Sequence, residues 1–110
     1  MKEKKKILLG LVFLPLAFIL LPFGRRASKP FRLHASGRYQ EALRGYKIWI
    51  SSKRILQKNK GLYFFNSGLL LKYLGEQEAA QELFAAAKKL GIEEDPERHE
   101  GNQPFIPKHK

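Results

Sequence analysis

Residues 37–46 read GRYQEALRGY, and residues 75–87 read GEQEAAQELFAAA. Both stretches begin with a glycine, and both place an alanine five residues later and an aromatic residue nine residues later. The two glycines, Gly37 and Gly75, are 38 residues apart. A glycine can turn the chain at the end of a helix, and a small residue lets two helices approach closely. The pattern therefore predicts two antiparallel helical hairpins in tandem.

The helices expected around these turns follow from apolar residues spaced three and four apart. One helix is expected to begin at Pro30 and end at Ser36, because proline is accepted in a first helical turn. The next is expected to run from Tyr39 to about Lys58 and to end at the sequence NKG of residues 59–61. A third helix is expected over residues 62–74. A fourth is expected after Gly75 and up to Leu90. No stretch alternates with a period of two, so the sequence predicts an all-α fold.

The repeat resembles the tetratricopeptide repeat (TPR) family, with about one and a half to two repeats between residues 25 and 92. The spacing exceeds the usual 34 residues or so of that family, which implies about four extra residues near 51–60. Pro30 and Trp49 stand where the family has a small residue. The signature positions are Gly37, Tyr39, Ala42, Tyr46, Gly68, Gly75, Ala80, Phe84 and Ala87.

The resemblance implies a protein-interaction module whose concave groove is lined by the first helix of each pair. Carried over by position, it gives seven candidate partner-binding residues. They are Phe31, His34, Phe65, Asn66, Leu69, Lys72 and Tyr73. The alternative is that Phe65, Leu69 and Tyr73 are ordinary core residues.

The N-terminal part has two segments of different character. Residues 1–6 are basic, and residues 7–24, ILLGLVFLPLAFILLPFG, carry no charge. Eighteen residues at 1.5 Å each extend about 27 Å, which predicts a transmembrane helix acting as a signal anchor. The alternative is a cleaved signal peptide, but the alanines that could serve as −1, at positions 17, 27 and 35, have Pro15, Arg25 and Leu33 at −3, and none of these is small. The short lysine-rich start favours a single-pass membrane protein with its C-terminal domain on the outer side.

Positive charge follows the apolar segment in a belt. Residues 25–60, here called the basic belt, hold eleven Lys and Arg residues and a single acidic residue, Glu41. The net charge of the whole 110-residue chain is +11, so most of it lies in this belt. Such a belt attracts anionic lipid, acidic proteins or nucleic acid. Nucleic acid is disfavoured because Tyr39, Tyr46 and Trp49 belong to an apolar helical stripe rather than to an exposed stacking surface.

The remaining sequence features argue against catalytic and metal-binding chemistry. The chain has no cysteine, and its histidines, His34, His99 and His109, are scattered. No metal-binding, nucleophile or phosphate-loop pattern is present, so the sequence predicts no enzyme, no cofactor and no small-molecule substrate. Residues 93–110 contain three prolines and little apolar content, which predicts a flexible tail.

These observations predict a non-catalytic, membrane-anchored TPR-like adaptor that mediates protein–protein interaction in a membrane-associated complex. Fewer than three repeats rarely bury their apolar faces alone, so a protein partner, a second copy or the lipid membrane is expected to cover one face. The alternative function is a basic membrane-surface module bound to anionic lipid, with the helices as a structural spacer.

Overall fold

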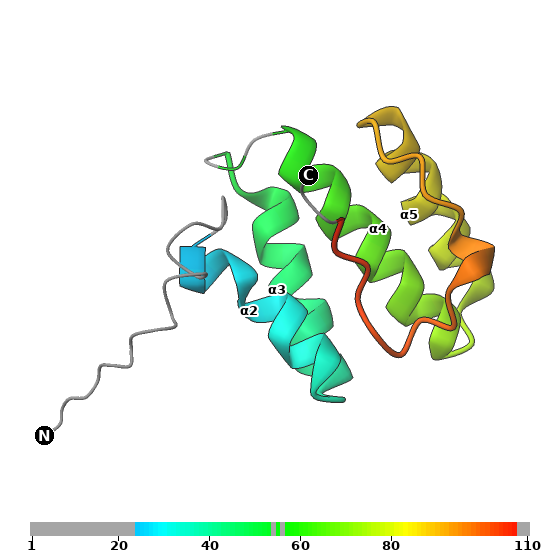
Figure 1. Cartoon of the computed structure of the whole chain (residues 1–110), viewed down its shortest axis with the longest axis horizontal. Helices are drawn as coiled ribbons and strands as arrows, with labels where there is room; N and C mark the ends of the chain where they lie inside the picture. Colours follow the sequence, from blue (N-terminus) through cyan, green and yellow to red (C-terminus); the bar gives the residue numbers. More distant parts are fainter. Residues whose placement is uncertain (1–23, 54, 56, 108–110) are drawn as a thin grey trace, which may run out of the picture.

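The computed structural model of the chain describes residues 24–53, 55 and 57–107. These residues form four α-helices, a short 3-10 helix and no strand, which confirms the all-α prediction for this part of the chain (Figure 1). The elements are α2 (Gly24–Ala35), α3 (Tyr39–Ser51), α4 (Gln57–Tyr73), α5 (Gln77–Lys89) and η1 (Pro96–Arg98).

The transmembrane part of the predicted fold class is wrong for the described residues. No helix among them is long and apolar enough to cross a membrane. The longest, α4, has 17 residues, and its sequence carries Lys58, Lys60 and Lys72. The predicted basic N-terminus, residues 1–6, and the predicted span, residues 7–24, lie outside the described residues except for Gly24, which begins α2.

The two hairpins turn in the same way, as the 38-residue repeat predicts. Gly37 and Gly75 have φ angles of 83° and 91°, which favour glycine. The residue after each glycine donates its backbone N–H five residues back, Arg38 to the Leu33 oxygen at 2.9 Å and Glu76 to the Leu71 oxygen at 2.8 Å. The same glycine-dependent turn therefore joins α2 to α3 and α4 to α5.

Each hairpin closes where a glycine faces a ring. In the second hairpin, a Cβ added to Gly68 of α4 would lie 2.6 Å from the ring of Phe84 on α5. In the first, a Cβ added to Gly45 of α3 would lie 2.9 Å from the ring of Pro30 on α2. In the second hairpin the first helix carries the glycine and the second helix carries the ring. In the first hairpin this order is reversed. Pro30 is thus accommodated inside α2 because Gly45 leaves room for it.

The core has two clusters of buried apolar residues, one centred on the first hairpin and α4 and one between α4 and α5. In the first, the Phe31 and Tyr63 rings stack at 5.2 Å, and the Tyr63 hydroxyl donates to the Ala27 oxygen at 2.7 Å. The first cluster contains Phe31, Ala42, Tyr46, Leu62, Tyr63 and Leu70. The second contains Phe65, Leu69, Ala80, Phe84 and Ala87. Of the signature residues, Ala42, Tyr46, Ala80, Phe84 and Ala87 are therefore core, whereas Tyr39 is half-buried.

Three helix boundaries differ by several residues from the sequence prediction: the starts of α2 and α4 and the end of α3. The first helix begins at Gly24 rather than at Pro30, and α3 ends at Ser51 rather than near Lys58. The NKG sequence lies inside α4 instead of ending a helix. A Cβ at position 61 would come within 2.9 Å of the Ile92 side chain. Gly61 therefore allows close packing and does not form a turn.

The chain after α5 also differs from the expectation of a flexible tail over 93–110. Residues 93–107, here called the C-terminal segment, pass down over α5, turn, and return beside α4 (Figure 1). Hydrogen bonds connect this segment to α2 and α4. Its low apolar content was misleading, because much of its attachment runs through backbone atoms. Residues 108–110 lie outside the described part of the chain.

Candidate peptide-binding face of α2 and α4

The seven candidate residues occupy one face of α2 and α4, and six of them lie against the C-terminal segment. The six are His34, Phe65, Asn66, Leu69, Lys72 and Tyr73. The seventh, Phe31, is 3% exposed and belongs to the first core cluster. Phe65 and Leu69 are also core residues, of the second cluster, as the alternative interpretation expected, whereas Tyr73 is 46% exposed. Because α2 and α4 are the first helices of the two hairpins, the repeat places these residues side by side. We call this surface the α2–α4 face.

Asn66 holds a single residue of the C-terminal segment by both of its backbone groups. Its side-chain oxygen accepts the Phe105 N–H at 2.6 Å, and its Nδ2 donates to the Phe105 carbonyl at 2.9 Å. The same Nδ2 donates to the Leu62 oxygen at 3.0 Å, which fixes the amide on α4. Asn66 is completely buried. Its amide binds the backbone of residue 105, so these hydrogen bonds do not depend on which side chain residue 105 has.

His34 makes the second backbone contact, from α2. Its Nε2 lies 2.8 Å from the Gly101 carbonyl, and its Nδ1 lies 2.8 Å from the Tyr46 hydroxyl. A carbonyl only accepts, so Nε2 carries the proton and the Tyr46 hydroxyl donates to Nδ1. Burial lowers the pKa of His34 below its ordinary value of 6.5, and the bond to Gly101 opposes this in part. His34 is therefore a neutral anchor at pH 7.

We expect this histidine to make stability depend on pH. The unfolded chain binds a proton at His34 near pH 6.5, whereas the folded chain resists protonation until lower pH. The free energy of unfolding should thus be constant above about pH 7.5 and fall as the pH is lowered through about 6.5. Urea denaturation between pH 5.5 and 7.5 measures this. H34Q should lose the dependence, H99Q should retain it, and equal slopes in H34Q and the wild type would contradict the assignment.

Gly101 packs directly against the backbone of α4. It is buried, its φ is 103°, and a Cβ there would lie 2.2 Å from the Leu69 carbonyl oxygen. The same Cβ would lie 3.0 Å from the Cβ of Tyr73. Neither the backbone conformation nor the space accepts a side chain, so only glycine fits at this position.

Lys72 and Phe65 complete the face at its two ends. The Lys72 ammonium donates to the Pro96 carbonyl at 3.0 Å and to the His99 carbonyl at 2.7 Å. The Phe65 ring meets the Phe105 ring edge-on at 5.4 Å. The α2–α4 face therefore combines polar side chains that bind backbone with an aromatic site that binds one ring.

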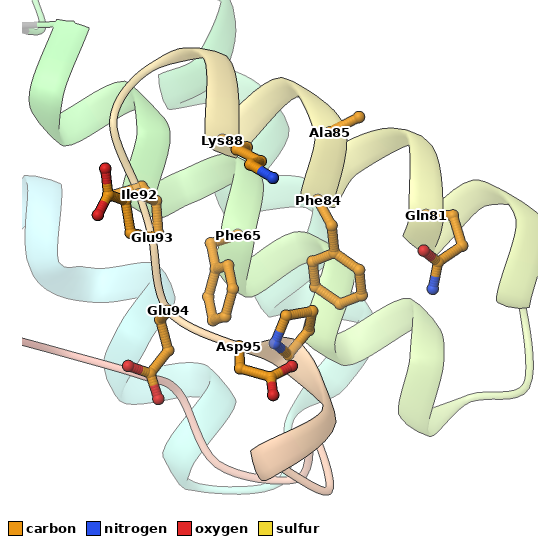
Figure 2. Close-up of a pocket in the computed structure, with 10 residues that line it drawn as sticks. Phe65, Gln81, Phe84, Ala85, Lys88, Ile92, Glu93, Glu94 and Asp95 are labelled. Atoms are coloured by element: carbon orange, nitrogen blue, oxygen red, sulfur yellow. The ribbon is translucent and has the colours of Figure 1, made fainter.

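A pocket of about 700 Å³ opens beside this face, between α5 and residues 92–96 (Figure 2). Its lining includes Phe65 and Phe84, with Lys88 on the α5 side and Glu93, Glu94 and Asp95 on the segment that borders it. Glu94 pairs with His99 at 2.7 Å. Aromatic walls next to carboxylates suit the alkyl stem and charged end of a lysine or arginine. Sequence reasoning missed this pocket because its residues come from α4, α5 and the segment assumed to be flexible.

A second pocket of about 460 Å³ lies on the basic belt, between α2 and α3. Arg26, Lys29 and Arg44 line it together with Trp49 and Ile48, and Ile48 is 66% exposed. Glu41, which also lines it, pairs with Arg38 at 2.7 Å. This pocket combines positive charge with apolar surface and lies apart from the C-terminal segment's contacts.

Comparisons with known proteins give no information on the function of the chain, so a functional proposal has to rest on the geometry. No protein-family model, no curated protein and no solved structure matches the chain. Within residues 24–53, 55 and 57–107, no group of three or more histidine, aspartate or glutamate side chains could hold a metal ion. The structure does present a face that holds a segment of polypeptide, residues 93–107, largely through hydrogen bonds to its backbone.

Proposed function

We propose that this protein is a non-catalytic, TPR-like adaptor that binds a polypeptide segment of a partner protein on its α2–α4 face. The partner belongs to a membrane-associated complex, a proposal that rests on the uncharged residues 7–24 and the basic belt behind them. The proposal needs no cofactor and no small-molecule substrate.

One observation carries the proposal: the face already holds a polypeptide, and it holds it by the backbone. Asn66 binds the N–H and the C=O of Phe105, and His34 and Lys72 bind three further carbonyls. Backbone groups are common to every polypeptide, so these contacts can be made to a segment of another protein. The side chains that provide them are among those for which the resemblance to the TPR family implies partner binding.

The test is binding of a peptide supplied in trans. A fluorescein-labelled peptide of residues 98–107 is titrated with the full chain carrying G101A, which weakens the chain's own segment and leaves the helices unaltered. We expect saturable binding in fluorescence anisotropy. Adding N66A to the same chain should reduce the affinity at least about tenfold, because two hydrogen bonds to the peptide backbone are lost.

Two controls make the result decisive. Circular dichroism should show the same helical content in the single and double variants, and limited proteolysis should show that G101A exposes residues 93–107. If the segment is exposed, the helices are intact and the peptide does not bind, the adaptor proposal is wrong. Equal binding with and without N66A would likewise contradict it.

A second function, a basic surface that binds anionic lipid, is favoured by the pocket on the basic belt. Exposed Ile48 stands beside Arg44 and Lys47, and apolar side chains flanked by cations are typical of helices that lie on membranes. Flotation of the full chain with vesicles of phosphatidylcholine alone or with phosphatidylserine distinguishes the two functions. Binding by this surface requires phosphatidylserine, weakens in 1 M salt where the Debye length is about 3 Å, and drops in I48S/R44S.

A further inference from the structure

We infer that the α2–α4 face selects segments with a glycine followed four residues later by an aromatic residue, and that the chain's own C-terminal segment competes with partners for it. This inference rests on the proposed adaptor function and adds to it the chemistry of the partner and a built-in competitor. It follows from Gly101, Phe105 and the contacts on each.

The requirement for glycine comes from contact as well as from the turn. Gly37, Gly75 and Gly91 also have positive φ angles, but a Cβ at any of these three would meet nothing within 4 Å. Gly101 is different, because its Cβ position lies 2.2 Å from the Leu69 carbonyl of α4. A backbone oxygen inside a helix cannot move aside. The face therefore excludes side chains at this point of any bound segment.

The requirement for an aromatic residue comes from the rings around Phe105. The Phe105 ring meets Phe65 at 5.4 Å and 66°, and meets His99 at 5.4 Å and 62°. Phe105 also packs against both core clusters. Edge-to-face pairs of this kind stabilise beyond the area that they bury. An aliphatic side chain at this position would lose them.

The spacing of four residues is fixed by two anchors on different helices. His34 of α2 binds the carbonyl of Gly101, and Asn66 of α4 binds both backbone groups of Phe105. Between them, Gln103 is exposed and reaches the Ala35 oxygen at 3.3 Å. The α2–α4 face thus reads the two ends of this stretch and tolerates variation at the position of Gln103.

For this competition the C-terminal segment has to leave the α2–α4 face while the hairpins stay closed. Its far end is accessible, since Ile106 is 51% exposed, and α4 packs on α5 and α2 on α3 directly. While attached, a tethered segment acts at an effective concentration of the order of millimolar. A partner segment with the same pattern must therefore bind more tightly than the tail does, or arrive at high local concentration.

The experiment compares peptides on chains with a weakened and an intact tail. Labelled peptide 98–107 is displaced by unlabelled versions carrying G101A, F105A or Q103A, with the full chain carrying G101A or, independently, F105A. We expect the G101A and F105A peptides to compete at least about tenfold more weakly than the wild-type peptide, and Q103A within about twofold. The wild-type chain should bind the labelled peptide at least about tenfold more weakly than either variant chain.

The outcomes separate this inference from the function on which it rests. If all four peptides compete equally, the selectivity is wrong, whereas the adaptor function stands. If the wild-type chain binds as tightly as the variant chains, the tail is not a competitor and the inference is overturned. If no peptide binds to a chain whose tail proteolysis shows to be released, the segment is a structural cap, and both the inference and the adaptor function fail.

Discussion

Replacing Asn66 with alanine is expected to lower the free energy of unfolding by about 3 kcal/mol and to release residues 100–107 from α4. The substitution removes the bonds to the Phe105 N–H, the Phe105 carbonyl and the Leu62 carbonyl. A single intramolecular hydrogen bond contributes about 1 kcal/mol, and buried groups left without a partner cost more. Opening the segment lets water reach these groups, which limits the loss.

Urea denaturation followed by circular dichroism measures the change in stability, and hydrogen exchange at the Phe105 amide measures the release. Asn102→Ala makes the same chemical change in the segment itself, at a half-buried side chain, and should alter stability by less than about 0.5 kcal/mol. N66D keeps an acceptor for the Phe105 N–H and should fall between the two. A Phe105 amide that stays protected in N66A would show that Asn66 does not hold the segment.

The hairpins were predictable because their signals are local. Gly37 and Gly75 mark turns that need a positive φ, and the Lys88 to Ile92 sequence ends α5 as expected, with the Ile92 N–H bonded to the Ala87 oxygen at 3.1 Å. Residues that fix a turn lie within a few positions of it. The sequence therefore contains everything that is needed to predict such features.

The boundaries that were missed depend on contacts between distant residues. Pro30 was expected to begin a helix, yet it lies inside α2 because Gly45 of α3 leaves space for its ring. Gly61 was expected to end a helix, yet it lies inside α4 because Ile92 packs against it. A glycine that serves close packing and a glycine that serves a turn are identical in the sequence. Which of the two roles a glycine has depends on the distant residue that packs against it.

The residues of the α2–α4 face were taken from the resemblance to the TPR family, and their role in binding a partner stays a prediction. Their position on one side of α4 follows from the helical period, whereas the segment that lies against them was not predicted. Composition could not show that the C-terminal segment would bind there, since the hydrogen bonds of Asn66, His34 and Lys72 are made to its backbone. Backbone groups are the same in every sequence, so such attachment leaves almost no compositional signal.

The second large effect is expected at Gly68, where alanine should lower the free energy of unfolding by about 2 kcal/mol. The added Cβ would lie 2.6 Å from the Phe84 ring, so α4 and α5 must separate or the ring must move against Phe65. Overpacking a core costs about 1–3 kcal/mol, and a contact of 2.6 Å with a buried ring is expected at the upper end of that range. The better helix propensity of alanine returns about 1 kcal/mol, and the exposed substitution Ala85→Gly on α5 measures that contribution in the same protein.

A double-mutant cycle shows whether the Phe84 ring is the cause. F84L alone should destabilise, because it removes buried apolar volume between α4 and α5. Combined with G68A it should cost at least about 1 kcal/mol less than the sum of the two single effects, since the smaller side chain leaves room for the new methyl group. Additive effects would mean that the Gly68 backbone, and not its contact with Phe84, requires glycine. Because this contact closes the second hairpin, a coupled result would locate the main constraint on helix spacing at Gly68 and Phe84.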